Sequence, residues 1–373
     1  MERRKFIKNY KRIVIKCGSA VVTDNSGKLD EKVIEKLAQS ISLFVNKGYK
    51  ITVVTSGAVA CGVGEFGREP KNLREKQAYA SVGQIILMES YKKAFQQFNK
   101  KVAQLLLTHD DFKNRKRFLN IKENIETLLS LNVIPIVNEN DSIVINEIKF
   151  GDNDQLSALF AGLFNADLLL LLTDIDGFYN GNPRDNSCCE LISSVEKVDE
   201  NIMKLAHTTK SRLGSGGMLS KLNAADKATS LGIPVIIANG KIEGIVDKVL
   251  SGEQYGTFFY PKKEKLKSKK FWIFYSAKSK GELIIDDGAV KAITKKGKSL
   301  LPVGIVEVNG KFEEGDIVKC IDKNGKFIAK GITYYSSEDI RKIRKHDSHE
   351  IKGILGYKYA DEVIHRDNLV IRK

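Results

Sequence analysis

The sequence predicts an α/β protein, with an open, mostly parallel sheet that is covered by helices on both faces and followed by a small β-rich domain. In the first 250 residues, short apolar runs alternate with segments of helical periodicity, which is typical of strands connected by helices. After a Lys-rich run, short alternating stretches are separated by frequent glycines, the pattern of a small β domain. We expect a first domain at residues 1–261, a Lys-rich linker at 262–270 and a second domain at 271–373.

Six strands are expected in the first domain, because six short apolar runs are bounded by polar residues or glycines. They are Arg12–Lys16, Lys50–Thr55, Lys101–Leu106, Val133–Val137, Leu168–Thr173 and Pro234–Ala238. Helices are expected between them. In residues 31–47, for example, Ile34, Leu37 and Ile41 recur at helical spacing, and Gly48 follows as a C-terminal stop.

The composition excludes several classes of protein. The chain has 373 residues and is 42% hydrophobic, enough to bury a large core. Its longest strongly apolar stretch, Ala166 to Leu172, is far shorter than the roughly 20 residues that cross a bilayer. The apolar run after the basic N-terminus, Ile13 to Ile15, is too short for a signal peptide. We therefore expect a cytoplasmic protein with no membrane contact.

The five cysteines fit neither a disulfide framework nor a zinc site. Their number is odd, and the sequence contains no C-x-x-C pair. Reduced thiols explain them. The adjacent Cys188 and Cys189 are either packed thiols in a connecting segment or a strained vicinal redox pair.

The net charge of +15 is not concentrated in one domain. Residues 1–261 carry 35 Lys and Arg against 30 acids, residues 262–270 carry six Lys against Glu264, and residues 271–373 carry 20 against 15. Each segment therefore contributes +5, and only the Lys run is locally dense. Such a run is usually a solvated linker, and contact with nucleic acid or polyphosphate is the alternative.

Ligands of open α/β sheets bind at the carboxyl ends of the strands. The first predicted strand ends in K-C-G-S, where the Lys16 ammonium group and a turn at Gly18 can bring positive charge and backbone N–H groups to a phosphate. The second ends in T-S-G-A, where Gly57 allows close backbone approach to an anion and Ser56 adds a hydroxyl donor. The alternatives are an exposed turn lysine and close packing of a helix on the sheet.

Residues 62–67 match G-x-G-x-x-G, the dinucleotide-binding fingerprint. That fingerprint joins a strand directly to a helix, whereas this one begins seven residues after the predicted strand. In addition, no clear ribose-binding acid ends a following strand. We therefore reject a dehydrogenase.

Two dense clusters of acids and amides follow the fourth predicted strand, V-N-E-N-D at residues 137–141 and K-F-G-D-N-D at residues 149–154. Carboxylates this close repel each other unless a cation, a substrate ammonium group or a lysine lies among them. A calcium loop is the rival interpretation, but the twelve-residue order with its terminal Glu is missing.

Two later segments also bring polar groups to the edge of the sheet. Five leucines at residues 168–172 run into Thr173 and Asp174. The run G-S-G-G-M at residues 214–218 leads to Lys221 at the start of a helix, which suits the β- and γ-phosphates of a nucleotide. It is not a Walker A loop, because the G-x-x-x-x-G-K-[ST] spacing is absent.

In this order, the motifs resemble those of the amino acid kinase family: I-K-x-G-S, V-T-S-G-A, N-E-N-D, G-D-N-D, L-L-T-D and G-x-G-G-M-x-x-K. The second domain is similar to a PUA domain in its S-L-L-P with Gly304, Phe312 with Gly315 and Asp316, and Gly331 with Tyr334. Within the family, the chain looks like the members that phosphorylate the γ-carboxylate of L-glutamate to open proline biosynthesis. The alternatives are members that act on acetylglutamate or aspartate, and an RNA-binding protein acting through the PUA domain.

The resemblance implies a role for each motif. Lys16 and Lys221 would clamp the phosphoryl group during a direct in-line transfer, and Asp154 would fix both ammonium groups. The residues that would hold glutamate are Ser56, Gly57, Asp141, Asp152 and Asn153, with Asp141 facing the substrate ammonium group. Those that would contact ATP are Lys16, Gly18, Thr173, Asp174, Ser215, Gly216, Gly217, Met218 and Lys221. Cys17 departs from the family, which more often has an aliphatic residue there, and a small buried thiol can substitute.

The resemblance also implies cofactors and partners. ATP and Mg²⁺ are expected, with Mg²⁺ held mainly by the ATP phosphates rather than by a metal site of the protein. Proline is expected as a feedback inhibitor at a site that overlaps the glutamate site, and the chain is expected to form a homo-oligomer, a dimer or tetramer. Nucleic acid is not expected as a partner, because the second domain is only mildly basic.

Overall fold

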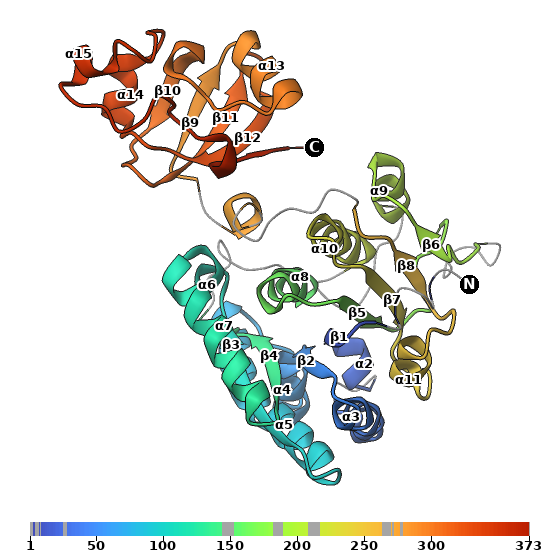
Figure 1. Ribbon diagram of the computed structural model, residues 1–373. Helices are drawn as coiled ribbons and strands as arrows, with labels where there is room; N and C mark the ends of the chain where they lie inside the picture. The colour runs from blue at the N-terminus through green and yellow to red at the C-terminus, as the bar shows by residue number, and fades with distance from the viewer. Residues whose placement is uncertain are drawn as a thin grey trace. The chain divides into compact units, whose positions relative to one another are not determined.

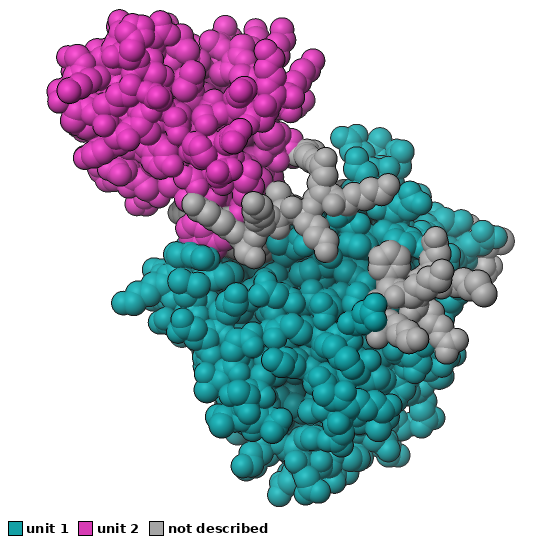
Figure 2. All heavy atoms as spheres, in the orientation of Figure 1, with its two compact units in different colours: residues 1–265 teal, residues 266–373 magenta. Residues whose placement is uncertain are grey.

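The computed structural model (Figure 1) describes residues 3, 7, 9–24, 28–143, 153–181, 189–207, 217–262, 270, 272–276 and 279–372. The chain divides into two compact units, Met1–Lys265 (unit 1) and Leu266–Lys373 (unit 2), which Figure 2 shows in different colours. The division falls inside the Lys-rich segment proposed as a linker, of which residues 263–269 lie outside the described part.

Unit 1 is built on a large sheet. Its strands in the described residues are Arg12–Cys17 (β1), Lys50–Thr55 (β2), Lys101–Leu107 (β3), Val133–Glu139 (β4), Leu168–Thr173 (β5), Ser194–Val195 (β6), Val235–Asn239 (β7) and Thr257–Phe259 (β8). Their order across the sheet is β3-β4-β2-β1-β5-β7-β8-β6. Every pair of neighbours is parallel except β7 and β8. This topology confirms the predicted open and mostly parallel sheet.

Helices connect these strands. Within the described residues they are Ser19–Val22 (α2), Glu31–Asn46 (α3), Ala58–Phe66 (α4), Leu73–Gln96 (α5), His109–Lys113 (α6), Arg115–Ser130 (α7), Asn153–Phe164 (α8), Glu200–His207 (α9), Met218–Ser230 (α10) and Ile245–Leu250 (α11). Residues at its two ends explain where α3 begins and where it stops. The Asp30 side chain caps it by accepting a hydrogen bond from the Val33 N–H, and Gly48 follows with a φ of +81°.

Successive side chains of β1 lie on opposite faces of the sheet, and this places the site. Ile13, Ile15 and Cys17 belong to the buried core that β1 shares with α3, α5 and α11. Lys16 points to the other face, where its ammonium group meets the carboxylate of Asp154 on α8. The sheet is therefore covered on both faces, and the polar groups gather on the α8 side.

The expected strands lie where the sequence predicts them. Two agree at both ends, Lys50–Thr55 and Leu168–Thr173, and the other four shift or extend by one or two residues. The sequence missed β6 and β8 because runs of two and three residues are too short to show an alternating pattern.

The G-x-G-x-x-G run forms the end of helix α4, with Gly67 as its C-terminal cap, and does not lie in a strand-to-helix loop. A Cβ added at Gly62 would lie 2.3 Å from the Tyr79 carbonyl oxygen, and one added at Gly83 would lie 1.8 Å from the Ala58 carbonyl oxygen. Gly62 and Gly83 therefore allow α4 and α5 to pack with their backbones in contact.

Unit 2 contains a smaller sheet with its own core. Its described strands are Gly281–Ile285 (β9), Ile305–Gly310 (β10), Ile317–Asp322 (β11), Phe327–Ile332 (β12) and Leu369–Ile371 (β13), in the order β10-β9-β11-β12-β13. The helical segments are Trp272–Ser276 (η2), Asp287–Lys296 (α13), Pro302–Gly304 (η3), Ser337–Ile343 (α14), Ile351–Leu355 (α15) and Arg366–Asn368 (η4). Leu283, Phe312 and Tyr335 are among its fully buried side chains. The second, β-rich domain is confirmed.

Across the described residues, no helix combines the length and the apolar character needed to span a bilayer.

Candidate active site

The carboxyl ends of the central strands meet at one edge of the sheet in unit 1. The backbone N–H of Gly18, just after β1, donates to the Leu172 carbonyl of β5 over 3.2 Å. The backbone N–H of Ser56, just after β2, donates to the Cys17 carbonyl over 3.1 Å. Gly240, after β7, donates in the same way to the Thr173 carbonyl. Motifs that are far apart in the sequence therefore adjoin here.

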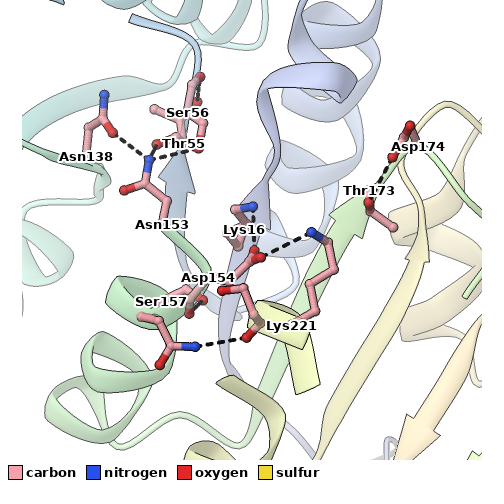
Figure 3. A network of polar contacts seen from close by, with 12 residues as sticks. Lys16, Thr55, Ser56, Asn138, Asn153, Asp154, Ser157, Thr173, Asp174 and Lys221 are labelled. Carbon is pink, nitrogen blue, oxygen red and sulfur yellow. Dashed lines mark hydrogen bonds and ion pairs between the residues drawn. The ribbon is translucent and has the colours of Figure 1, made fainter. Parts of the chain in front are cut away.

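A buried ion-pair triad forms the centre of this edge (Figure 3). The ammonium group of Lys16 lies 2.5 Å from Oδ1 of Asp154, and that of Lys221 lies 3.1 Å from Oδ2 of the same carboxylate. Asp154 is fully buried, while Lys16 and Lys221 are 5% and 6% exposed. Three charged groups rarely lie this deep unless they compensate one another.

The electrostatics of the triad keep Asp154 ionised. Burial by itself raises the pKa of this carboxyl, but the Lys16 and Lys221 ammonium groups outweigh the effect, and the pKa lies below its usual value. With two ammonium groups and one carboxylate, the triad carries a net charge of +1. An anion that reaches it meets a compact, partly desolvated positive charge.

Three elements position the triad. Lys16 projects from β1, Asp154 belongs to the first turn of α8, and Lys221 belongs to the first turn of α10. A second contact joins α8 to α10 beside it: Gln155 Nε2 donates to the Ser220 carbonyl over 2.9 Å, and the Lys227 ammonium group donates to Gln155 Oε1. The residues next to Asp154 and Lys221 in sequence therefore hold the two helices together.

A second polar cluster centres on Asn153. Its Nδ2 lies 2.7 Å from the Thr55 carbonyl, 2.8 Å from Ser56 Oγ and 2.8 Å from Asn138 Oδ1. Figure 3 shows these contacts gathering the ends of β2, β4 and α8. Ser56 and Asn153, both proposed to hold the substrate, are thus in direct contact.

The turn after β2 requires glycine. Gly57 has a φ of +114°, a conformation that is strained for residues with a Cβ, and it immediately precedes α4. A Cβ there would also lie 3.2 Å from Val22 Cγ2.

Asp141, which is expected to face the substrate ammonium group, lies in the turn that follows β4 and is half-buried.

Thr173 and Asp174, two of the residues expected to contact ATP, lie on the other side of the triad from Asn153 (Figure 3). Thr173 is buried at the end of β5 and donates from Oγ1 to Asp174 Oδ1 over 3.2 Å. Gly217 precedes α10 and Met218 begins it. The N–H of Gly18 is bonded to the Leu172 carbonyl, and a Cβ at this position would make only ordinary contacts, 3.4 Å from the Leu172 carbonyl oxygen and 3.6 Å from Lys16 Nζ. Asp152, Ser215 and Gly216 lie outside the described residues.

Cys17, the departure from the family pattern, is buried in the core on the opposite side of β1 from Lys16. Burial raises the pKa of its thiol to about 12, against the opposing effects of Lys16 and the Tyr91 hydroxyl. The thiol is therefore neutral and packs as a small apolar group.

The sequence did not single out three side chains that the structure brings into this network: Gln84, Asn138 and Gln155. Asn138 belongs to the N-E-N-D motif, and Gln155 directly follows Asp154. Their positions beside predicted site residues could therefore have indicated both. Gln84, in the middle of α5, is near no motif.

Known proteins resemble the chain over most of its length. The model of the amino acid kinase family matches residues 11–239, and that of the PUA domain matches residues 281–355. The chain is 46% identical over 362 residues to a glutamate 5-kinase of Caldanaerobacter subterraneus, covering 96% of this chain and 97% of that protein. It is 45% identical over 373 residues to the glutamate 5-kinase of Syntrophotalea carbinolica, covering all of both chains. With that of Geobacter sulfurreducens it shares 45% over 371 residues, 99% of this chain and 100% of that one.

Proposed function

The chain belongs to the amino acid kinase family and, within it, to the glutamate 5-kinases, and we propose that it transfers the γ-phosphoryl group of ATP to the side-chain carboxylate of L-glutamate. The product is L-glutamyl 5-phosphate, the first intermediate of proline biosynthesis. The observation that carries the proposal is the buried pair of ammonium groups on Asp154, at the sheet edge where ligands of such folds bind.

The acceptor in this reaction needs no catalytic base. A glutamate side chain has a pKa of about 4.3 and is already an anion at neutral pH. The protein must instead bring two anions together, hold them in line and stabilise the charge on the phosphoryl group as it moves.

Lys16 and Lys221 would stabilise that charge from two sides. Each ammonium group is already fixed by a carboxylate oxygen of Asp154, so neither has to reorganise when the transition state forms. Asp154 also prevents the two buried cations from repelling each other. The triad retains one net positive charge, which would stabilise the negative charge on the phosphoryl group.

Glutamate would lie between the triad and the polar cluster around Asn153. Ser56, Gly57 and Asn153 line the ends of β2 and α8, and Asp141 follows β4 at the same edge. Asp141 would face the substrate ammonium group, and backbone N–H groups would face its α-carboxylate. Asp152, in the G-D-N-D motif, would assist.

ATP would approach from the side of β5 and α10. A cationic triad suits a triphosphate, and the contacts would come from Gly18, Thr173, Asp174 and the segment from Ser215 through Gly216, Gly217 and Met218 to Lys221. Mg²⁺, held mainly by the ATP phosphates, would supply further neutralisation of the phosphate charge. The transfer would be in line and direct, with no phosphorylated residue of the protein.

An assay of ATP-dependent hydroxamate formation tests the proposal, with L-glutamate, L-aspartate and acetylglutamate as alternative acceptors. We expect activity with glutamate to exceed that with either of the others by orders of magnitude. A preference for aspartate or acetylglutamate, or no ATP-dependent product from glutamate, would overturn it.

A further inference from the structure

A further polar cluster lies beyond the ends of β5 and β7 and takes no part in the mechanism proposed above. Asp176 Oδ1 accepts a hydrogen bond from Asn239 Nδ2 over 2.9 Å, and Asp176 Oδ2 accepts one from the Tyr179 hydroxyl over 3.3 Å. Asp176 is exposed, whereas Thr173 and Phe178, on either side of it in sequence, are buried. The turn therefore presents a carboxylate at the surface from a buried base.

The carboxylate of Asp176 is held in place from two directions. Asn239 Oδ1 accepts from the backbone N–H of Lys241 over 2.9 Å, and because this N–H can only donate, the Asn239 amide must turn its nitrogen to Asp176. The turn itself is anchored on β8, where the Phe178 N–H donates to Thr257 Oγ1 over 2.8 Å. The acceptor is thus preorganised, which lowers the cost of binding a ligand there.

The cluster lies along the same sheet edge as the triad. Thr173 and Asn239 are direct partners in the register of β5 and β7, and β5 separates β7 from β1. Two strand spacings of about 4.8 Å therefore lie between the triad end of β1 and the end of β7. Figure 3 shows Thr173 on the far side of Lys221 from Asn153, so this direction leads away from the proposed glutamate site.

An in-line transfer places the leaving nucleotide opposite the acceptor. With glutamate on the side of β2 and β4, an ATP molecule whose γ-phosphate lies at the triad extends over β5 toward β7. Its ribose, which follows three phosphates, then lies over the end of β7. The two substrates would therefore approach the triad from opposite sides of the edge.

The chemistry of Asp176 suits a sugar and not a phosphate. A carboxylate repels phosphate oxygens but accepts hydrogen bonds from hydroxyl groups, and its two oxygens offer about four acceptor positions. Being exposed, Asp176 can accept from a ligand while it keeps its bonds to Asn239 and Tyr179. Acidic side chains bind ribose hydroxyls in this way at the edges of other α/β sheets.

We propose that Asp176 accepts hydrogen bonds from the ribose hydroxyls of ATP and thereby selects a ribonucleotide as the phosphoryl donor, with Asn239 and Tyr179 as the residues that position its carboxylate. This inference rests on the proposed function for the direction in which ATP lies, and it adds a residue that determines donor specificity.

The test measures the affinities of the full chain for ATP and for 2′,3′-dideoxy-ATP, which keeps the base and the triphosphate but lacks both hydroxyls. Isothermal titration calorimetry in the presence of Mg²⁺ gives the two Kd values. Asp176→Ala removes the carboxylate. Asp199→Ala is the matched control, because Asp199 is also exposed in unit 1 and also accepts two hydrogen bonds, from the backbone N–H groups of Asn201 and Ile202.

We expect the unaltered chain to bind ATP at least about tenfold more tightly than the dideoxy nucleotide, since hydrogen bonds to a charged acceptor are lost with the hydroxyls. In Asp176→Ala the two Kd values should agree within about threefold, because ATP binds more weakly while the dideoxy nucleotide is little affected. Asp199→Ala should keep the preference. Asp176→Ser, which retains a short polar side chain in the turn, gives the same comparison should the alanine variant fail to fold.

Equal affinities of the unaltered chain for the two nucleotides would overturn the inference, and so would a preference for ATP that persists in Asp176→Ala and Asp176→Ser. A variant that keeps the preference but needs more Mg²⁺ would show that Asp176 acts on the metal ion instead. The affinities require no acceptor, so they are independent of the hydroxamate assay. A chain that shows this selectivity but does not phosphorylate glutamate would retain the role of Asp176 and refute the proposed function.

Discussion

Lys16 and Lys221 share one carboxylate: their ammonium groups lie 2.5 Å and 3.1 Å from the two oxygens of Asp154. One lysine comes from the first strand of the sheet and the other from a helix late in unit 1. Because Asp154 is fully buried, the two cations are held at a fixed separation before any ligand arrives.

Removing either ammonium group should therefore abolish most of the activity. Lys16→Ala and Lys221→Ala should each lower kcat at least 100-fold, since an electrostatic donor of this kind stabilises a transition state by about 3 kcal/mol. Steady-state kinetics with glutamate and ATP measure the effect, and circular dichroism checks the fold. Lys36→Ala, which removes an exposed lysine paired with Glu243, serves as the control. Near-normal turnover in either site variant would rule out the clamp.

The triad should also be visible in the pH dependence of stability. The folded-state pKa of Asp154 lies below its value of about 3.9 in an unfolded chain. Its contribution to stability is therefore fully present above about pH 4 and is lost as the pH falls through the folded-state pKa.

Asp154→Asn should be less stable than the unaltered chain at pH 7, by about 3 kcal/mol, because two buried ammonium groups lose their counter-charge. The difference should shrink as the pH falls below about 4. Urea unfolding of both proteins at pH 7, 4 and 3 measures it. A difference that stays constant over this range would show that the Asp154 charge does not stabilise the fold.

Asp141→Ala should mainly weaken glutamate binding. We expect KM for glutamate to rise at least tenfold, the effect of removing a charged partner of the substrate ammonium group, while KM for ATP changes less than threefold. Initial rates with each substrate varied separately give both constants. A change confined to KM for ATP would show that Asp141 does not contact glutamate.

Gly83→Ala should destabilise unit 1 by about 1–3 kcal/mol, because its Cβ would lie 1.8 Å from the Ala58 carbonyl oxygen and α4 and α5 would have to separate. Thermal unfolding monitored together with loss of activity measures this. Ser81→Ala, at an exposed position of the same helix, should have little effect. If both variants melted at the same temperature as the unaltered chain, the close approach of the two helices would not be required.

Sequence reasoning located the sheet and its edge because the information there is local. Each of β1, β2, β4 and β5 is an apolar run followed by polar residues or glycine, and parallel strands bring such ends to the same edge. The strand ends alone did not place Asp154, which belongs to the first turn of α8; the resemblance to the family implied its contact with Lys16 and Lys221.

The hydrogen bond between Gln84 and Asn138 could not be found in this way. Gln84 lies on a helix whose sequence around it, A-S-V-G-Q-I-I-L, shows only the spacing of a packed surface. Its contact with Asn138 depends on how α5 packs in the folded unit, where Gly62 and Gly83 let the backbones of α4 and α5 touch. The partners of Gln155 on α10 could not be predicted either, because they depend on how α8 packs against α10.

The position of β1 between β2 and β5 has a consequence for biosynthesis. A ribosome releases β1 early, but its partner β5 begins only at Leu168, so a nascent chain carries an open strand edge for much of its synthesis. Lys221 follows later still. Under the proposed mechanism, fragments that stop short of α10 would contain the first strands of the sheet but would lack Lys221, and activity would require synthesis of the last third of unit 1.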